Sequence, residues 1–239
     1  MNELEFFSRK KIKKFIPKEY HFHNTFPYYI PLFGNMFWRR IKFISKLIYQ
    51  IQIILKKKIY KVLDVGCEIS FFSFNYGKNN PMVEIKGIDI LTEKQNIFIN
   101  RLYKKYSINF EIINHDIQKK SIYYDETFDL IVAFDVLEHL HDLNSALLEI
   151  KRLLKNNGLL IISIPVESKI LKFFRLIYFK TIKKTPVTTR HYTKGGVVTS
   201  FKEYEELIKD NFNIHLICRY PFRSFPLELA YNCFYVLTK

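Results

Sequence analysis

The chain has 239 residues, of which 48% are hydrophobic and 26% charged, and its formal net charge is +15. This length suits one α/β domain with attachments and is short for two ordinary domains, and the near-average composition argues against wholesale disorder. The three cysteines show no paired spacing, which argues against a disulfide framework or a zinc site and indicates a reducing compartment. We therefore expect a cytoplasmic protein.

Residues 1–60 form a basic and aromatic extension with 13 Lys or Arg against 3 acids. The start lacks the apolar segment of a secretory signal, and the longest apolar stretches are interrupted by polar residues, so we predict no transmembrane helix. Apolar residues recur from Phe37 to Leu55 at spacings of three and four, which predicts an amphipathic helix. Its apolar stripe either packs on the core or docks on a membrane surface.

From residue 61 onward, apolar runs alternate with helical patterns, which predicts a doubly wound, mostly parallel sheet with helices on both faces. The last two strands are too close for a helical crossover, so we predict that they pair antiparallel at the edge. The domain organisation expected is therefore 1–60 as a helical extension and 61–239 as one α/β domain. The predicted strands are 61–65, 83–89, 108–113, 129–134, 158–164, 213–219 and 231–238.

Helix starts are marked by capping residues. Thr92 with Gln95 and Ser200 with Glu203 match the capping-box pattern, and Asp142 is a candidate N-cap. The helix after Asp142 shows one apolar face, and we predict that Asn156 to Gly158, read as "NNG", ends it.

The stretch "VLDVGCEIS" indicates a buried strand that opens into a tight turn at Gly66. Asp89 follows Asp64 by 25 residues at the end of the next strand, where a carboxylate can bind a ribose diol. A dinucleotide needs a G-x-G-x-x-G turn for its pyrophosphate, and a carboxylate at Glu68 would repel that group. A cofactor without phosphate therefore fits better.

In order and spacing, these motifs resemble the class I S-adenosylmethionine-dependent methyltransferases. The resemblance covers about residues 60–165 and rests on "VLDVGCEIS", "IKGIDI", "NHDI", "FDLIVAFDVLEHL" and "LLKNNGLLIISIP". It implies a Rossmann-like fold with S-adenosylmethionine as cofactor. The "EHL" turn is common in the branch of the family that acts on small molecules and lipids.

The resemblance also implies which residues contact the cofactor. Asp89 would bind the ribose hydroxyls, and Asp116 would accept a hydrogen bond from the exocyclic amine of adenine. Glu68 and Ser70 stand where the family has glycines, so Glu68 could engage the cofactor, point to solvent or block the site. We expect weak binding to survive. The implied cofactor-binding residues are Asp64, Gly66, Cys67, Glu68, Asp89, Ile90, Asp116, Ile117, Phe134 and Asp135.

A general base is needed only when the methyl acceptor is a hydroxyl or an acidic carbon. We predict His139 or His191 as the base, and the alternative for His139 is a bracing role in the turn after the fourth strand. "DVLEH" also resembles a metal-binding arrangement of ubiquinone-pathway and small-RNA methyltransferases, in which Asp135, Glu138 and His139 would hold a divalent ion. Metal binding is the less favoured of these alternatives.

Residues 166–190 follow the fifth strand, where the family inserts covers over the acceptor. Aromatic and basic residues alternate here, as they do in the N-terminal extension, so segments 9–58 and 169–184 fit an anionic membrane surface. A solvated lid and a single-stranded RNA surface are the alternatives. RNA is less favoured as a partner, and a peripheral position on the inner membrane face is the alternative location.

We therefore predict methyl transfer to a hydroxyl or similar nucleophile of a small, lipid-linked or glycan-type acceptor. Two other hypotheses remain at this stage. One is a degenerate binding protein whose Glu68 blocks the cofactor, and the other is a metal-assisted RNA methyltransferase.

Overall fold

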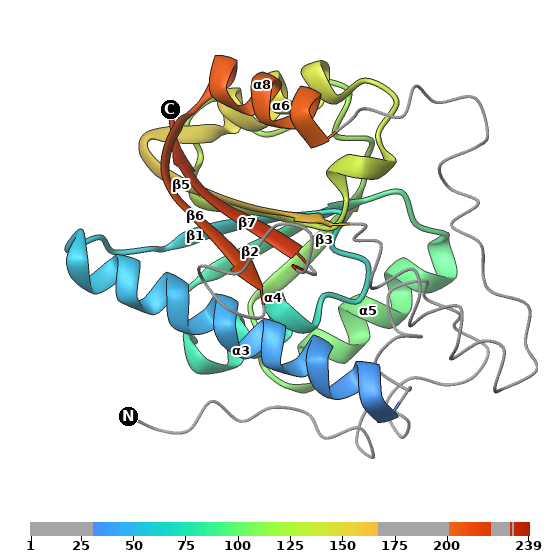
Figure 1. Cartoon of the computed structure of the whole chain (residues 1–239). Coiled ribbons are helices and arrows are strands. Elements are labelled where there is room, and N and C mark those ends of the chain that lie inside the picture. The colour runs from blue at the N-terminus through green and yellow to red at the C-terminus, as the bar shows by residue number, and fades with distance from the viewer. Residues whose placement is uncertain (1–30, 167–200, 221–229, 231) are drawn as a thin grey trace, which may run out of the picture. The chain divides into compact units, whose positions relative to one another are not determined.

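A computed structural model describes residues 31–166, 201–220, 230 and 232–239 of the chain (Figure 1). The predicted lid at 166–190 therefore lies outside the described residues except for its first position, as do His191, Ser200 and the first 30 residues. Among the described helices, none combines the length and the hydropathy that a bilayer crossing requires. All three cysteines are buried free thiols.

Seven strands form one mixed sheet in the order β3-β2-β1-β4-β5-β7-β6. Strands β1, β2 and β3 pair in parallel, whereas β7 pairs antiparallel with both β5 and β6. This arrangement confirms the predicted sheet and its antiparallel end. The strands are β1 (Lys61–Val65), β2 (Glu84–Asp89), β3 (Phe110–Asn114), β4 (Phe128–Phe134), β5 (Leu154–Pro165), β6 (Asn213–Tyr220) and β7 (Asn232–Thr238).

Contacts divide the chain into two compact units, the first comprising 1–116 with 128–130 and the second 117–127 with 131–239. The first holds α3 (Pro31–Ile54), α4 (Phe71–Asn79) and α5 (Glu93–Lys105) beside β1, β2 and β3. Its core gathers apolar side chains from all three helices, including Ile41, Phe74 and Tyr103. The predicted capping box of Thr92 and Gln95 is present at the start of α5.

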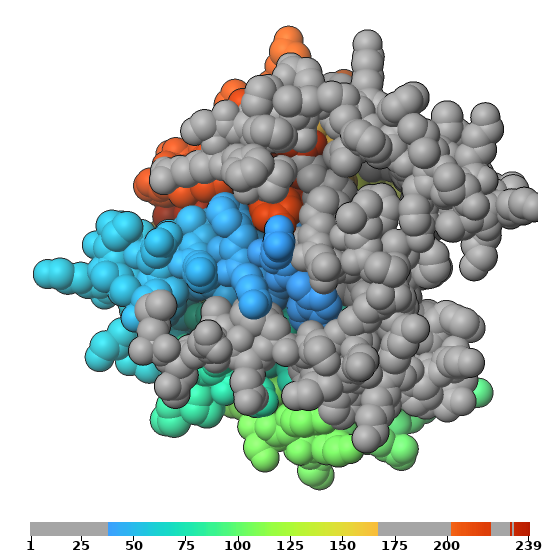
Figure 2. Space-filling model, turned by 60° about the horizontal axis from the view of Figure 1, so that its bottom comes forward, coloured from blue at the N-terminus to red at the C-terminus, as the bar shows by residue number. Residues whose placement is uncertain are grey.

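Helix α3 is the predicted amphipathic helix, and its apolar stripe faces inward. Ile41, Ile44, Ile48 and Ile51 are all buried, so the packing alternative is the one observed for this stripe. The other side of α3 lies at the surface, and Figure 2 shows it in blue on the face turned toward the viewer.

The second unit holds the short helix η2 (Leu137–His139), α6 (Leu143–Leu153), α8 (Phe201–Asn211) and the strands β5 to β7. Helices α6 and α8 lie side by side (Figure 1), and the Lys151 ammonium lies 5.9 Å from the centre of the Phe212 ring. Asp142 caps α6 as predicted, because its carboxylate accepts from the Ser145 N–H at 2.9 Å.

The predicted end of α6 is wrong. The helix ends at Leu153, and the "NNG" residues belong to β5. The backbone carbonyls of Arg152 and Leu153 accept from the N–H groups of Glu126 and Thr127 at 2.9 and 3.0 Å. These long-range hydrogen bonds satisfy the last carbonyls of the helix, so the helix ends before the "NNG" residues.

Candidate cofactor and acceptor sites

The turn after β1 contains one glycine but two residues with left-handed backbone, Gly66 and Glu68. Gly66 has φ 66° and donates its N–H to the Ile88 carbonyl at 2.8 Å. Glu68 has φ 40°, in the left-handed region that favours glycine. An acidic residue therefore occupies a backbone position of the kind that favours glycine.

Asp89 anchors this loop from the end of β2. Its Oδ2 accepts from the Glu68 N–H and its Oδ1 from the Ile90 N–H, both at 2.6 Å. Each oxygen retains a further acceptor lone pair. The carboxylate is half-buried, and this burial raises its pKa despite the two backbone donors. Ile90 beside it is 70% exposed and presents an apolar surface.

Asp64 lies beneath the loop. Its buried carboxylate accepts from the hydroxyl groups of Ser70 and Ser73, and the Ser70 hydroxyl in turn accepts from the Ser73 N–H at 3.0 Å. Burial raises the pKa of Asp64 to about 6, although both hydroxyls favour its charged form. Asp64 is therefore a brace for the loop, and its predicted contact with the cofactor stays a prediction.

Ser70 has a specific role at its position. Besides its bond to Asp64, it is the N-cap of α4. Cys67 is buried against β2, since a Cβ atom placed on Gly87 would come within 2.6 Å of the Cys67 sulfur. Burial raises the pKa of this thiol well above its usual value, which keeps it protonated.

The third predicted acid follows β3. Asp89 pairs in register with Asn114, whose side-chain oxygen accepts from the Leu91 N–H at 3.1 Å, and Asp116 lies two residues further on. Since β1, β2 and β3 are parallel, Asp64, Asp89 and Asp116 lie at the same edge of the sheet. Their implied contacts with a cofactor stay a prediction.

In the second unit, Asp135 follows β4 with φ 53°, another left-handed position. Its Oδ1 accepts from the Ser163 hydroxyl at 2.7 Å and from the Asn232 amide at 2.6 Å. Ser163 and Asn232 are fully buried on β5 and β7. Strands β5 and β7 therefore hold the Asp135 carboxylate at the end of β4. Residues with a strained backbone such as that of Asp135 occur often at functional sites.

The other predicted site residues of this unit are His139, Phe134 and Ile117. Tyr204 on α8 donates its hydroxyl to the Leu137 carbonyl at 3.0 Å, which fixes η2. The side chain of His139 is 46% exposed, and its Nε2 lies 3.8 Å from Glu138 Oε1. Phe134 packs edge-on against Phe234 with ring centres 6.4 Å apart, and Ile117 is buried.

Within the described ranges, no three His, Cys, Asp or Glu side chains are grouped so that they could hold a metal ion. Asp135, Glu138 and His139, which the sequence offered as metal ligands, are thus not gathered as such a group. Instead, Asp135 accepts hydrogen bonds from two neutral donors.

Several residues that shape these sites were missed at the sequence level. Tyr103 on α5 donates its hydroxyl to the Ser70 carbonyl at 2.7 Å and so holds the loop together with Asp64. The pair Ser70 and Ser73 has N-cap spacing and could have been found. Tyr103, Ser163 and Asn232 leave no local signal, because each reaches its partner only through tertiary folding.

Comparison with known proteins identifies the family. A model described as a methyltransferase domain matches residues 56–211, which is more than half of the chain.

The chain belongs to this methyltransferase family.

The sequence-based assignment to the class I S-adenosylmethionine-dependent methyltransferases is thereby confirmed, and membership implies S-adenosylmethionine as the cofactor. The chain is 33% identical to the uncharacterized protein MJ0638 of Methanocaldococcus jannaschii over 72% of its own length and 68% of that protein. It is 29% identical to a ubiquinone biosynthesis O-methyltransferase of Histophilus somni, over 66% and 65% of the two chains.

Solved structures agree on the fold of this methyltransferase. The PH0226 protein of Pyrococcus horikoshii matches with a TM-score of 0.64 and 23% identity, covering 93% of this chain and 99% of that one. An S-adenosylmethionine-dependent methyltransferase of Clostridium acetobutylicum matches with a TM-score of 0.61 and 13% identity, over 81% and 89% of the two chains.

Proposed function

We propose that this methyltransferase transfers a methyl group from S-adenosylmethionine to a hydroxyl or similar nucleophile of a small, lipid-linked or glycan-type acceptor. The observation that carries the proposal is the hydrogen-bonded junction between Asp89 and the loop at Glu68. Support for an oxygen acceptor comes from relatives, since two ubiquinone biosynthesis O-methyltransferases are each 29% identical to this chain.

The residues of the first unit fit the cofactor. Asp89 keeps one acceptor position on each oxygen for the two hydroxyls of a ribose, and the exposed Ile90 offers an apolar surface beside it. The carboxylates of Glu68 and Asp89 suit a ligand with positive charge and oppose a pyrophosphate. When bound, S-adenosylmethionine supplies a methyl group on a sulfonium, which a nucleophile takes by in-line displacement. Asp116 is the proposed acceptor for the adenine amine.

The residues of the second unit serve the acceptor in this proposal. The half-exposed His139 takes the proton from the attacking hydroxyl, and Glu138 beside it stabilises the charged imidazole that results. Asp135 accepts a hydrogen bond from the same acceptor molecule, while Ser163 and Asn232 keep its carboxylate in place.

The competing hypothesis is a non-catalytic binding protein in which Glu68 closes the cofactor site. The geometry of the loop favours the enzyme, because the Glu68 backbone adopts the glycine-type conformation and donates its N–H to Asp89. If the loop had collapsed into the cofactor site, we would expect the Glu68 N–H and the Asp89 carboxylate to be separated rather than hydrogen-bonded.

Calorimetry with S-adenosylmethionine tests the proposal. We expect binding by the wild type, and a loss of roughly 10-fold to 100-fold in affinity for Asp89→Ala, because the variant loses charge-assisted hydrogen bonds to the ligand. Glu111→Gln is the matched control, since this exposed acid on β3 pairs with Lys86 outside the proposed site. No measurable affinity in the millimolar range would refute the proposal.

Transfer of tritiated methyl from the cofactor identifies the acceptor class. We expect the label in the lipid or small-molecule fraction of a cell extract, with at least a 10-fold lower rate for His139→Ala and an unchanged cofactor affinity. Label found in RNA instead would support the metal-assisted alternative and overturn the proposed acceptor.

A further inference from the structure

Helix α3 has a second stripe of side chains, on the side opposite its buried apolar stripe. Arg39, Lys42, Lys46, Tyr49 and Ile53 recur at spacings of three and four residues, and all five are exposed. Residues with this spacing lie on one face of a helix. The stripe is cationic over its first three positions and apolar over its last two.

The apolar end of this stripe continues past the end of the helix. Ile54 is 75% exposed, Leu55 48% and Tyr60 56%. A tight turn fixes this region: Lys56 has φ 50°, and the Lys57 N–H donates to the Gln52 carbonyl at 3.0 Å. We call the exposed residues here the α3-end patch, which consists of Tyr49, Ile53, Ile54, Leu55 and Tyr60 with the cations Lys46, Lys56 and Lys58.

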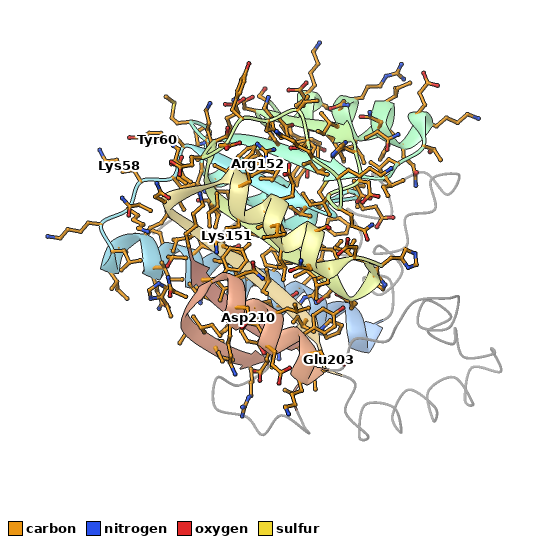
Figure 3. The ribbon with its side chains drawn as sticks, turned by 90° about the horizontal axis from the view of Figure 1, so that it is seen from above. Lys58, Tyr60, Lys151, Arg152, Glu203 and Asp210 are labelled. Carbon is orange, nitrogen blue, oxygen red and sulfur yellow. The ribbon has the colours of Figure 1, made fainter. Side chains whose placement is uncertain are left out.

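The patch lies on an open surface. Figure 2 shows the second half of α3 and the residues after it uncovered on the face toward the viewer, and Figure 3 shows Lys58 and Tyr60 next to one another at the outside of the molecule. Three consecutive exposed aliphatic residues, Ile53 to Leu55, form an apolar cluster of the kind that marks an interaction site.

The charge of the patch selects the partner. No acidic residue occurs between Glu19 and Asp64. Within the part of the chain that the structure describes, the ammonium groups of Lys46, Lys56 and Lys58 form no salt bridge. An aliphatic cluster beside unneutralised cations is complementary to a surface that is anionic outside and apolar beneath.

We propose that the α3-end patch docks this methyltransferase on an anionic lipid surface, with Ile53, Ile54 and Leu55 inserted among the acyl chains and Lys46, Lys56 and Lys58 at the headgroups. Single-stranded nucleic acid is the weaker partner, because it requires aromatic planes for base stacking and the most exposed hydrophobic residue of the patch is the aliphatic Ile54. The proposal goes beyond methyl transfer and does not depend on it.

Vesicle flotation tests the proposal with the full chain. The probe vesicles contain phosphatidylcholine with or without 30% phosphatidylglycerol. We expect flotation only with the anionic vesicles. We also expect flotation to be lost in 1 M salt, because the screening length for charge interactions in solution then falls to about 3 Å. No flotation, or equal flotation with neutral vesicles, would overturn the proposal.

Two matched pairs of variants assign the binding to the patch. The triple variant Ile53→Ser, Ile54→Ser, Leu55→Ser should reduce the floated fraction at least 5-fold, whereas Met82→Ser, Ile97→Ser, Ile122→Ser removes exposed apolar side chains elsewhere and should change it less than 2-fold. Likewise, the triple variant Lys46→Glu, Lys56→Glu, Lys58→Glu should abolish flotation. The control variant Lys94→Glu, Lys119→Glu, Lys120→Glu changes the net charge by the same amount at exposed lysines elsewhere and should still float.

Flotation that survives both patch variants would place the lipid contact elsewhere and refute the proposal. Retention of the protein by a single-stranded oligonucleotide but not by vesicles would also refute it. Cofactor affinity measured on the same variants stays unchanged in either case, so failure here is distinguishable from failure of the proposed methyl transfer.

Discussion

At the scale of single residues, this glycine-poor chain places ordinary residues where the backbone is left-handed. Lys56 ends α3, Ser107 ends α5, and Glu68 and Asp135 occupy the two candidate sites. Each such position costs about 1 kcal/mol relative to glycine. Lys56 and Ser107 only end a helix, whereas Glu68 and Asp135 are acidic residues in the turns that form the two candidate sites. These two strained positions therefore lie in the candidate sites, where strain of this kind often accompanies function.

Asp64 makes stability depend on pH. Its pKa is about 6 in the folded chain against an ordinary value of 3.8, so the folded state holds the proton more tightly. The stabilising contribution is complete below pH 4 and is lost as the pH rises through about 6. Its size is roughly 3 kcal/mol, since each unit of pKa difference corresponds to about 1.4 kcal/mol.

We therefore predict that the unfolding free energy of the wild type, relative to Asp64→Asn, falls by roughly 3 kcal/mol between pH 4 and pH 7. Asparagine does not titrate, so the difference isolates the Asp64 carboxyl from other groups. Urea unfolding at several pH values measures it. A difference that is independent of pH would contradict the assigned pKa.

At the scale of elements, the cofactor loop is held between a strand and a helix. Asp64 on β1 accepts from the hydroxyl groups of Ser70 and Ser73, and Tyr103 on α5 donates to the Ser70 carbonyl. The Tyr103 ring also stacks on Phe110 of β3 at 3.9 Å between ring centres. Helix α5 therefore positions the loop as well as covering the sheet.

Tyr103→Phe should keep the ring packing and lose the hydroxyl. We predict a loss of about 1 kcal/mol in unfolding free energy and a several-fold weaker affinity for S-adenosylmethionine, because the loop gains freedom that binding must remove. Tyr235→Phe is the control, since its hydroxyl donates to Glu205 at 2.9 Å in the second unit. Equal effects of both variants on cofactor affinity would show that Tyr103 has no specific role in positioning the loop.

At the scale of the whole molecule, the positive charge is concentrated in two segments of the sequence. Residues 1–60 contribute +10 (13 bases and 3 acids) and residues 165–190 contribute +6 (7 bases and 1 acid), so the rest of the chain sums to −1. Residues 61–164 and 191–239, which include the candidate sites, are thus nearly neutral overall.

Binding of S-adenosylmethionine should stabilise the whole fold, because the loop and strand ends that we propose as its site exist only in the folded state. At a ligand concentration of about 100 Kd the stabilisation is about 2.7 kcal/mol. For a chain of this size we predict a rise in Tm of roughly 5–10 °C. A thermal melt measures the shift, and a nicotinamide dinucleotide at the same concentration should produce none. A shift with the dinucleotide alone would contradict the assigned cofactor class.

The local sequence was sufficient for the order of the elements and for the acids at the strand ends. Buried strands require runs such as "LIVAF", and tight turns after them require an acid or a glycine, so these features are written in consecutive residues. The capping positions Thr92 and Asp142 were likewise predictable, because a cap acts on its own first turn.

What the fold alone determined are the contacts between distant segments. Helix α6 ends at Leu153 because N–H groups 26 residues earlier bond to its carbonyls, and Asp135 is held by Asn232, 97 residues away. The inward direction of the α3 stripe, and the exposed patch left at its end, also depend on what packs against the helix. A hydrogen bond or a buried face of this kind exists only once both partners are placed, so no local pattern can encode it.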